Sequence, residues 1–473
     1  MAYNIILQAM STLPRTNVLK KCKFSMPEKL RGAKPYYGQL EPVSIMMIKS
    51  GTIPDMILSL CTKETTEKKT FALEENPDEV FNMTAYEFYQ DRIKAILPPS
   101  VSTVFQTVDI DESNINAGIV GAAKQILEVK AKLERECANA ADKKIKLWVN
   151  TQGGFRDISL VLNAIVNLMS VYEIEIADIY SMPFGVEKEG GTPIESKMQN
   201  YQIFDFVVGM KEFLNYGRAD TLENYYTNRK NQNRRTSSQE ENLMSTMKKV
   251  ADAIQMCDPR GFNDCLIELR KRINSYKESG EQFFDIFVEK VKEDYGILLS
   301  ENYNTIDVVK WFRKKEFYQQ ALTYIEAYVP KELVAKGILS WKYNKAEVDR
   351  VKKVRKQLYV EDANYLLFSL CNARTKDSVK MKKAFEKNIE NRKFTVQDGG
   401  ESTVVQLKKP LIGMALSERK KLFDFIDNYY KLKALRNQFN HMSEKEKRIT
   451  KTQLSNIIAR FELLGNNLYK LYQ

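Results

Sequence analysis

Two patterns of apolar residues divide this chain, and the division constrains its fold more than any other feature. In the first half, short strand-like apolar runs alternate with helix-like stretches, and the last clear strand-like run is Glu173–Tyr180. After about Tyr201, nearly all apolar patterns have helical spacing. Alternating strands and helices are typical of an α/β sheet. The sequence therefore predicts a Rossmann-like α/β N-terminal domain, a helical connector and an all-α C-terminal domain.

The predicted elements of the first half are compact apolar segments. The expected strands are Asn4–Ala9, Val43–Ile48, Ser102–Asp109, Lys144–Val149 and Glu173–Tyr180. The expected helices are Asn116–Ala138, Asp157–Ser170 and Ile203–Tyr216. We place the domains at residues 1–225, 226–300 and 301–473. The polar segment 228–242 is expected to be mobile, and a β-hairpin is expected near 392–409, around Asp398-Gly399-Gly400.

Composition narrows the class of protein. The net charge of +12 favours polyanionic partners, although a lysine-rich protein without a nucleic-acid role would look similar. Six scattered cysteines without a CxxC pair indicate reduced thiols in the cytoplasm and no zinc site of the usual spacing. No apolar run is long enough to span a bilayer, and the N-terminus lacks the pattern of a signal peptide, so neither a membrane nor secretion is expected.

Metal and dinucleotide sites are not expected. His441 is the only histidine, which excludes a histidine-rich metal centre. Asp109-Ile110-Asp111-Glu112 is interpreted as a solvated loop. No GxGxxG is present, and the glycine-containing stretch 185–192 lacks the lysine of a P-loop, so it is interpreted as a plain loop. We expect no metal and no cofactor.

The segment Ser417–Glu444 predicts a long amphipathic helix that carries the most informative polar residues. Its apolar stripe comprises Leu422, Phe425, Ile426, Tyr429, Leu432, Leu435 and Phe439. On its polar edge, Arg436 and Asn440 lie on neighbouring turns, as do Asn437 and His441. Phe423 and Tyr429 are interpreted as core residues, whereas Tyr430 is left open as a stacking platform for a base.

These side chains fit metal-independent RNA cleavage by 2′-hydroxyl attack. His441 has the pKa range for proton transfer near neutral pH. Arg436 supplies a permanent charge for the phosphorane, and Asn437 could orient the phosphate or the imidazole. Arg436 and His441 lie about 140° apart around an ideal helix. They converge on one phosphate if the helix end relaxes or if a second copy faces the first. The alternative is a surface helix whose arginine and histidine are merely solvated.

A second candidate site lies in the first half. The turn Asn150–Arg156 leads from a strand into a helix, and the loop Met10–Thr16 follows the first strand. At the carboxyl ends of an open sheet both loops border the same crevice. The residues suited to a nucleotide ligand are Ser11, Thr12, Arg15, Thr151, Gln152, Gly153, Gly154 and Arg156. A tight structural turn is the alternative for the two glycines.

At this point the chain resembles a known family. Arg436-Asn437-Gln438-Phe439-Asn440-His441 is similar to the R-N-x-x-x-H form of the HEPN ribonuclease motif. The stretches Trp148–Asp157 and Phe206–Asp220 resemble the CARF domain of the ancillary CARF–HEPN ribonucleases of type III CRISPR systems, and Trp311–Ile338 resembles the helical pair that opens their effector domain. The resemblance spans nearly the whole chain.

This resemblance implies a cytoplasmic homodimer that cuts single-stranded RNA in antiviral defence. The expected products end in 2′,3′-cyclic phosphates. A cyclic oligoadenylate of four or six units is the implied allosteric activator, with Ser11, Thr12, Thr151 and Gln152 as carried-over positions, and no stable association with the CRISPR effector complex is implied. Two alternatives remain: a CARF sensor or ring nuclease whose helical domain only binds RNA or a partner, and a HEPN toxin of a toxin–antitoxin pair.

Overall fold

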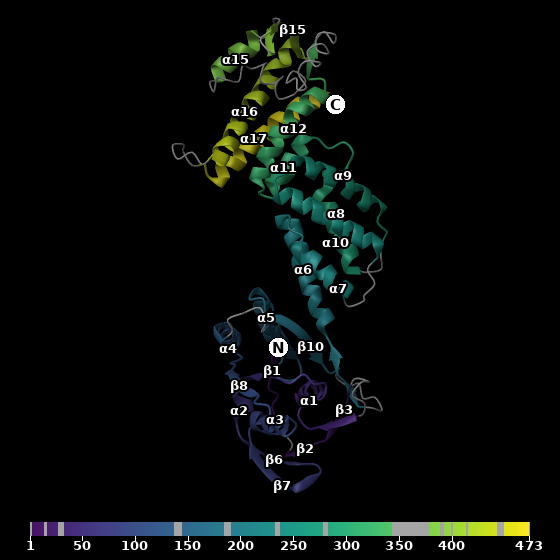
Figure 1. The fold of residues 1–473 in the computed structure, drawn as a ribbon, viewed down its shortest axis with the longest axis vertical. Helices are drawn as coiled ribbons and strands as arrows, with labels where there is room; N and C mark the ends of the chain where they lie inside the picture. Colours follow the sequence, from purple (N-terminus) through teal and green to yellow (C-terminus); the bar gives the residue numbers. More distant parts are fainter. Residues whose placement is uncertain are drawn as a thin grey trace. The chain divides into compact units, whose positions relative to one another are not determined.

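The computed structural model describes residues 2–13, 17–26, 33–136, 144–183, 191–231, 237–277, 282–342, 378–387, 392–398, 401–412, 415–441 and 449–472. The chain forms two compact units, Met1–Ile203 and Phe204–Gln473. The first is an α/β unit and the second is largely helical (Figure 1). The division falls inside helix α6 (Met198–Tyr216).

A six-stranded sheet organises the first unit. In spatial order its strands are β12 (Glu195–Ser196), β10 (Glu175–Ser181), β9 (Ile145–Asn150), β1 (Tyr3–Ala9), β5 (Met56–Cys61) and β8 (Val104–Asp109). The neighbouring pairs among the last five are parallel, and β12 runs antiparallel to β10. From β1 the chain builds outward through β5 and β8, and it then returns to β9 on the other side. The strand order therefore reverses between β1 and β9.

Helices cover both faces of this sheet (Figure 1). Successive side chains of a strand point to opposite faces, and in β1 Ile5 and Leu7 pack on one face while Ile6 packs on the other. The first face carries α4 (Ile115–Glu136) and α5 (Ile158–Val171). The second carries α1 (Glu41–Lys49) and α3 (Ala85–Lys94). Burial on both faces explains the nearly continuous apolar sequence of the central strands.

Two small sheets lie beside the second face. One contains β2 (Val18–Leu19), β6 (Lys69–Leu73) and β7 (Asn76–Met83). The other contains β11 (Thr192–Pro193), β3 (Cys22–Ser25) and β4 (Ala33–Tyr36). The short helix α2 (Lys63–Thr66) follows β5. No element was predicted for these segments, because strands of two to five residues carry little periodic signal and the eight-residue β7 is mostly exposed, without an alternating pattern.

Most predicted elements of the first unit are confirmed to within a few residues, one is wrong, and the helix α3 and the strand β5 were not predicted. The predicted strand Val43–Ile48 is wrong, since this segment is helix α1, which begins with Glu41-Pro42. Most of its residues are buried, and a short apolar run has no periodicity that separates a buried strand from a buried helix. The strand β5 was missed, although Met56–Cys61 is a compact, fully buried run in the centre of the sheet.

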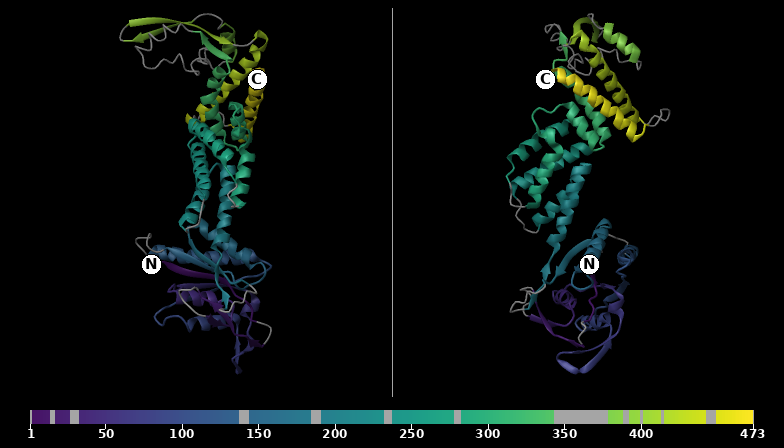
Figure 2. Two further views of the ribbon diagram at one scale, coloured as in Figure 1. Left: turned by 90° about the vertical axis from the view of Figure 1, so that its right-hand side faces the viewer. Right: turned by 180° about the vertical axis from the view of Figure 1, so that it is seen from behind.

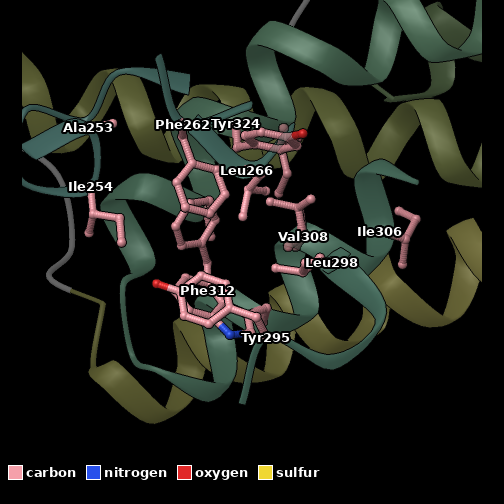
Figure 3. Packing of buried hydrophobic residues seen from close by; sticks show 14 of the residues in the cluster. Ala253, Ile254, Phe262, Leu266, Tyr295, Leu298, Ile306, Val308, Phe312 and Tyr324 are labelled. Atoms are coloured by element: carbon pink, nitrogen blue, oxygen red, sulfur yellow. The ribbon is translucent and has the colours of Figure 1, made fainter. Parts of the chain in front are cut away.

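The second unit buries its apolar side chains in one continuous core (Figure 3). Besides α6, its helices are α7 (Asp220–Asn231), α8 (Ser238–Gln255), α9 (Pro259–Ser275), α10 (Gln282–Tyr295), α11 (Thr305–Lys314), α12 (Tyr318–Ala335), α15 (Ser378–Lys387), α16 (Arg419–His441) and α17 (Lys451–Tyr469), with short 3-10 turns at Gly296–Leu299, Leu416–Glu418 and Lys470–Tyr472. Aromatic rings from different helices meet in this core; Phe262 of α9 lies 4.9 Å from Phe312 of α11 between ring centroids. None of the helices in the described ranges is both long enough and apolar enough to cross a membrane.

Four helices pack together at the C-terminal end of the core, and one of them, α16, carries the predicted catalytic residues. Helix α11 packs against α12 and α17, and α16 packs against the same two helices. Figure 2 shows α16 and α17 side by side. A two-pronged ion pair fastens α11 to α17: Arg313 Nε donates to Glu462 Oε1 at 2.7 Å and Arg313 Nη2 donates to Glu462 Oε2 at 2.9 Å. The position of α16 is therefore set by packing on both sides.

The predicted hairpin is confirmed. Strands β14 (Arg392–Asp398) and β15 (Glu401–Ile412) are antiparallel, and β15 also pairs with β13 (Leu339–Lys342). Both ends of the polar segment 228–242, which was expected to be mobile, are helical, because α7 extends to Asn231 and α8 begins at Ser238; residues 232–236 lie outside the described part. The Ser237 hydroxyl accepts from the Glu240 N–H and caps α8.

The boundary between the two units lies earlier than the predicted end of the first domain at residue 225. Phe206 and Phe213 of α6 and Leu222 of α7 belong to the core of the helical unit. Sequence periodicity identifies these helices but does not say which core their apolar faces join, since both cores offer apolar partners. The α/β unit therefore ends near Ile203.

Candidate functional site

The two loops expected to bind a ligand lie together at the point where the strand order reverses. Residues 10–13 follow β1 and residues 151–154 follow β9, and these two strands are neighbours in the sheet. A Cβ atom at Gly153 would lie 2.5 Å from Ser11 Oγ and 2.6 Å from the Ala9 carbonyl oxygen. The loops are thus in close contact. In open α/β sheets such a reversal is where ligands bind.

The two glycines have a structural reason. Gly153 and Gly154 have φ angles of +92° and +84°, a region that other residues enter only with strain. A Cβ atom at Gly154 would lie 2.8 Å from Ile158 Cγ1. The turn into α5 therefore needs glycine for its backbone conformation and for its close approach to β1, whatever else the loop binds.

Thr151 and Gln152 make internal hydrogen bonds. The Thr151 hydroxyl donates to the Tyr180 carbonyl at 2.9 Å. Gln152 Nε2 donates to Ser181 Oγ at 3.0 Å and to the Met182 carbonyl at 3.1 Å. Both side chains fasten the end of β10 to the loop after β9. A ligand that used either side chain would have to share or replace these bonds.

The other predicted ligand residues are less constrained. Ser11 Oγ donates to Gln39 Oε1 at 3.2 Å. Thr12 and Arg156 are exposed. Arg15 lies outside the described residues. Of these residues, Ser11 and Thr12 line a cavity in this unit.

A cavity of about 430 Å³ adjoins Ser11 and Thr12 on the face of the sheet that carries α1 and α3. Its lining combines apolar groups with polar ones, including Leu13, Leu19, Lys20, Tyr37, Gln39 and Phe88. Thr151 and Gln152 are not part of its lining. A mixed lining of aromatic, hydroxyl, amide and ammonium groups is the type found around small organic ligands.

An ion pair between the buried Glu41 and Arg92 lies beside this cavity. Glu41 at the start of α1 is 1% exposed, and its Oε2 lies 2.7 Å from Nε of Arg92 in α3. Burial raises the pKa of the Glu41 carboxyl, and the Arg92 guanidinium opposes that rise. The Gly38 N–H donates to Glu41 Oε1 at 2.7 Å. The guanidinium of Arg92 also lies 4.9 Å from the Tyr37 ring centroid. These contacts hold two walls of the cavity together.

In the helical unit, Arg436 lies near the C-terminal end of α16. Its side chain is 30% exposed. Nη1 donates to Asn437 Oδ1 at 3.3 Å, and Nε lies 3.4 Å from Glu326 Oε2 of α12. Lys433, one turn earlier, places its Nζ 3.1 Å from Glu326 Oε1. Arg436 and Asn437, both predicted as catalytic residues, are therefore in direct contact, and Arg436 also belongs to a charge cluster with Lys433 and Glu326.

His441 is the last residue of α16, and its side chain lies outside the described part, as does that of Asn440. The helix is continuous from Arg419 to His441, so the backbone positions of Arg436 and His441 are five residues apart on one regular helix, as predicted. At 100° per residue these two backbone positions lie about 140° apart around the helix. The described end of the helix does not relax in a way that removes this separation.

The apolar stripe of α16 is confirmed except at its end. Leu422, Phe425, Ile426, Tyr429 and Leu432 are buried, but Phe439 is 42% exposed. The prediction that the stripe docks along its whole length is therefore wrong for the last turn. Phe423 is buried, as expected; Tyr430, which was left open, is half-buried against the core.

Sequence reasoning missed Glu326. One signal was present, because Glu326 is the only charged residue in the stretch 321–330 of an otherwise mainly apolar helix.

No cluster of three or more histidine, cysteine, aspartate or glutamate side chains within the described ranges is arranged to hold a metal ion. In the 109–112 loop, the Ser113 N–H donates to Asp111 at 2.8 Å and lowers the pKa of this carboxyl, as in an ordinary turn. Residues 185–190 of the glycine-containing loop lie outside the described residues.

Comparison with models of known protein families gives no match to this chain, and comparison with curated proteins gives none.

Proposed function

We propose that this protein is a CARF–HEPN endoribonuclease of type III CRISPR antiviral defence, which cuts single-stranded RNA without a metal ion and is activated by a cyclic oligoadenylate. The observation that carries the proposal is the half-buried Arg436, paired with Asn437 five residues before His441 on one continuous helix. Its contacts with Asn437 and Glu326 distinguish Arg436 from an arginine that only solvent surrounds. We place the reaction in the cytoplasm.

The proposed chemistry is an internal transfer at one phosphate. The 2′-hydroxyl of the RNA attacks the adjacent phosphorus while His441 takes its proton. Arg436 compensates the negative charge of the phosphorane oxygens. The bond to the 5′-oxygen of the next nucleotide breaks, and this oxygen receives a proton. The products are a 2′,3′-cyclic phosphate and a 5′-hydroxyl, so the atoms balance without water or metal.

The site requires two copies of the chain. Arg436 and His441 diverge around α16, and in one copy they do not face the same phosphate. Two α16 helices related by a twofold axis would bring two arginines and two histidines to one cleft. We therefore propose that the enzyme acts as a homodimer.

The α/β unit supplies the proposed sensor. The contacting loops at the strand reversal and the adjacent cavity support a binding site for part of a cyclic oligoadenylate, with Ser11 and Thr12 at its edge. Thr151, Gln152 and Arg156 would complete the contacts if the ring displaced the bonds to the end of β10. A toxin of a toxin–antitoxin pair would have no need of this site.

The decisive experiment combines labelled single-stranded RNA with the full chain in EDTA, with and without cyclic tetra- or hexa-adenylate. We expect cleavage that depends on the messenger, leaves 2′,3′-cyclic phosphates, and falls by at least ~10²-fold in Arg436→Ala and His441→Ala. Arg460→Ala, which removes an exposed arginine of α17, is the matched control and should cleave normally. Cleavage that needs magnesium, or that survives in His441→Ala, contradicts the proposal.

A further inference from the structure

Glu326 faces the proposed catalytic arginine from a different helix. Its Oε2 lies 3.4 Å from Arg436 Nε and its Oε1 lies 3.1 Å from Lys433 Nζ. The Glu326 side chain is 24% exposed, and both Glu326 Oε2 and Arg436 Nε are shielded from solvent. One carboxylate of α12 therefore spans two cations on the same face of α16.

The backbone fixes the place from which Glu326 reaches. Its neighbour Ile325 and the nearby Val329 are buried in the core, so the α12 backbone is held against the other helices at this point. Pro330 lies inside α12 and has no N–H, which means that the Glu326 carbonyl lacks its usual helical donor. A proline in this place is tolerated only where packing fixes the helix. Glu326 therefore lies on a turn of α12 that buried neighbours hold in place and that lacks the hydrogen bond from residue 330.

The contact with Arg436 differs from a closed ion pair. Arg313 and Glu462 of the same unit form two aligned hydrogen bonds at 2.7 and 2.9 Å, which occupy one whole edge of the guanidinium. Glu326 instead approaches Arg436 at Nε without hydrogen-bond alignment, and Nη1 is directed to Asn437 Oδ1. The guanidinium is orientated by two neighbours, and no carboxylate among the described residues makes an aligned two-bond contact with it.

We propose that Glu326 is a positioning residue for Arg436, holding the guanidinium by its Nε side so that its outer N–H groups meet the scissile phosphate. This inference rests on the proposed ribonuclease function. A partly exposed ion pair adds little to stability, and this contribution does not require one carboxylate to contact two cations of α16. A catalytic arginine, by contrast, must be held within a fraction of an ångström of its place in the transition state, and contact with a carboxylate on a neighbouring helix can hold it there.

The test compares Glu326→Gln with the wild-type full chain in the messenger-activated RNA cleavage assay, at saturating and at limiting RNA. We expect kcat to fall by roughly 10- to 100-fold, the loss typical of a catalytic group displaced by about an ångström. KM should stay the same or decrease, because removal of a negative charge beside Arg436 does not weaken binding of a polyanion. Glu326→Asp retains the charge and should recover part of the lost kcat.

Two controls separate positioning from a structural role. Asp427→Asn breaks another ion pair of α16, in which Lys431 Nζ lies 2.6 Å from Asp427 Oδ2. This variant should leave kcat unchanged, although it should shift the thermal midpoint about as much as Glu326→Gln does. In an Arg436→Lys background, Glu326→Gln should cause little further loss, since it acts through Arg436.

The outcomes are distinct. A wild-type chain that cleaves no RNA refutes the proposed function and this assignment with it. If the wild type cleaves and Glu326→Gln has the same kcat, the assignment alone is wrong. A rise in the activity of Glu326→Gln identifies Glu326 as an inhibitory counter-ion and overturns the positioning role. An equal loss in the wild-type and Arg436→Lys backgrounds also overturns it.

Discussion

The contact between the two loops of the α/β unit can be tested at Gly153. An alanine there would bring a Cβ atom to 2.5 Å from Ser11 Oγ and 2.6 Å from the Ala9 carbonyl oxygen, at a φ of +92°. Gly51 is a matched control: its φ is +87°, but no atom lies within 4 Å of the Cβ position. The two substitutions share the backbone strain and differ only in the steric overlap.

The difference can be estimated. A residue other than glycine in the left-handed region costs about 1–2 kcal/mol, and this applies to both variants. Overlap with packed atoms costs about a further 1–3 kcal/mol; it applies only to Gly153→Ala, because the Ala9 carbonyl belongs to β1 and has little freedom to move. Gly153→Ala should therefore destabilise the unit by about 2–5 kcal/mol and Gly51→Ala by about 1–2 kcal/mol.

Hydrogen exchange followed by mass spectrometry measures this in the full chain. The extra 1–3 kcal/mol corresponds to roughly 5- to 150-fold faster exchange of the amides of β1 and β9 in Gly153→Ala than in Gly51→Ala. Exchange in α16 should be the same in both variants, because it belongs to the other core. Equal acceleration of β1 and β9 in the two variants would refute the close approach of the loops and the candidate ligand site built on it.

Two further predictions concern stability and reactivity. Glu462→Gln should lower the free energy of unfolding of the helical unit by about 1.5–3 kcal/mol, measured by urea titration, because it removes a charged partner from two hydrogen bonds of Arg313; an unchanged unfolding curve contradicts this. Burial raises the pKa of the Cys61 thiol to about 12 from an ordinary 9.0, so its contribution to stability is present below about pH 9 and is lost as the pH rises toward 12. Exposed Cys22 should therefore be alkylated at pH 8 while Cys61 is protected, as read by peptide mass spectrometry; equal labelling of the native chain contradicts this.

The sequence predicted those parts of the fold that local periodicity determines. The strand β9 and the helix α5 have clear patterns, and the two glycines between them mark a sharp turn. Because strands alternate with helices, a parallel sheet was expected, and in such a sheet the loops after its strands share one edge. The contact between Ser11 and Gly153 follows from this topology, without knowledge of any side-chain partner.

The parts that were missed depend on partners distant in the sequence. Residues 43–48 form a helix because they pack between the sheet and α3, and no local pattern specifies this. Thr151 and Gln152 have the right chemistry for a ligand, yet the carbonyls at the end of β10 already accept their hydrogen bonds. Glu326 lies 110 residues before Arg436 in the sequence, and only the packing of α12 on α16 brings them together.

The last turn of α16 presents two features that a single chain leaves unexplained. Phe439 is 42% exposed although the rest of the apolar stripe is buried, and Arg436 points about 140° away from His441. On helical geometry Phe439 lies about 60° from Arg436, on the same side of α16. A second copy of α16 packed against this side would cover the aromatic ring, but the backbone position of His441 lies about 160° from that of Phe439 and would stay outside such an interface. The proposed twofold site instead needs an interface centred between Arg436 and His441, about 130° around α16 from Phe439, so a substitution of Phe439 should leave the proposed dimer intact, as measured by sedimentation.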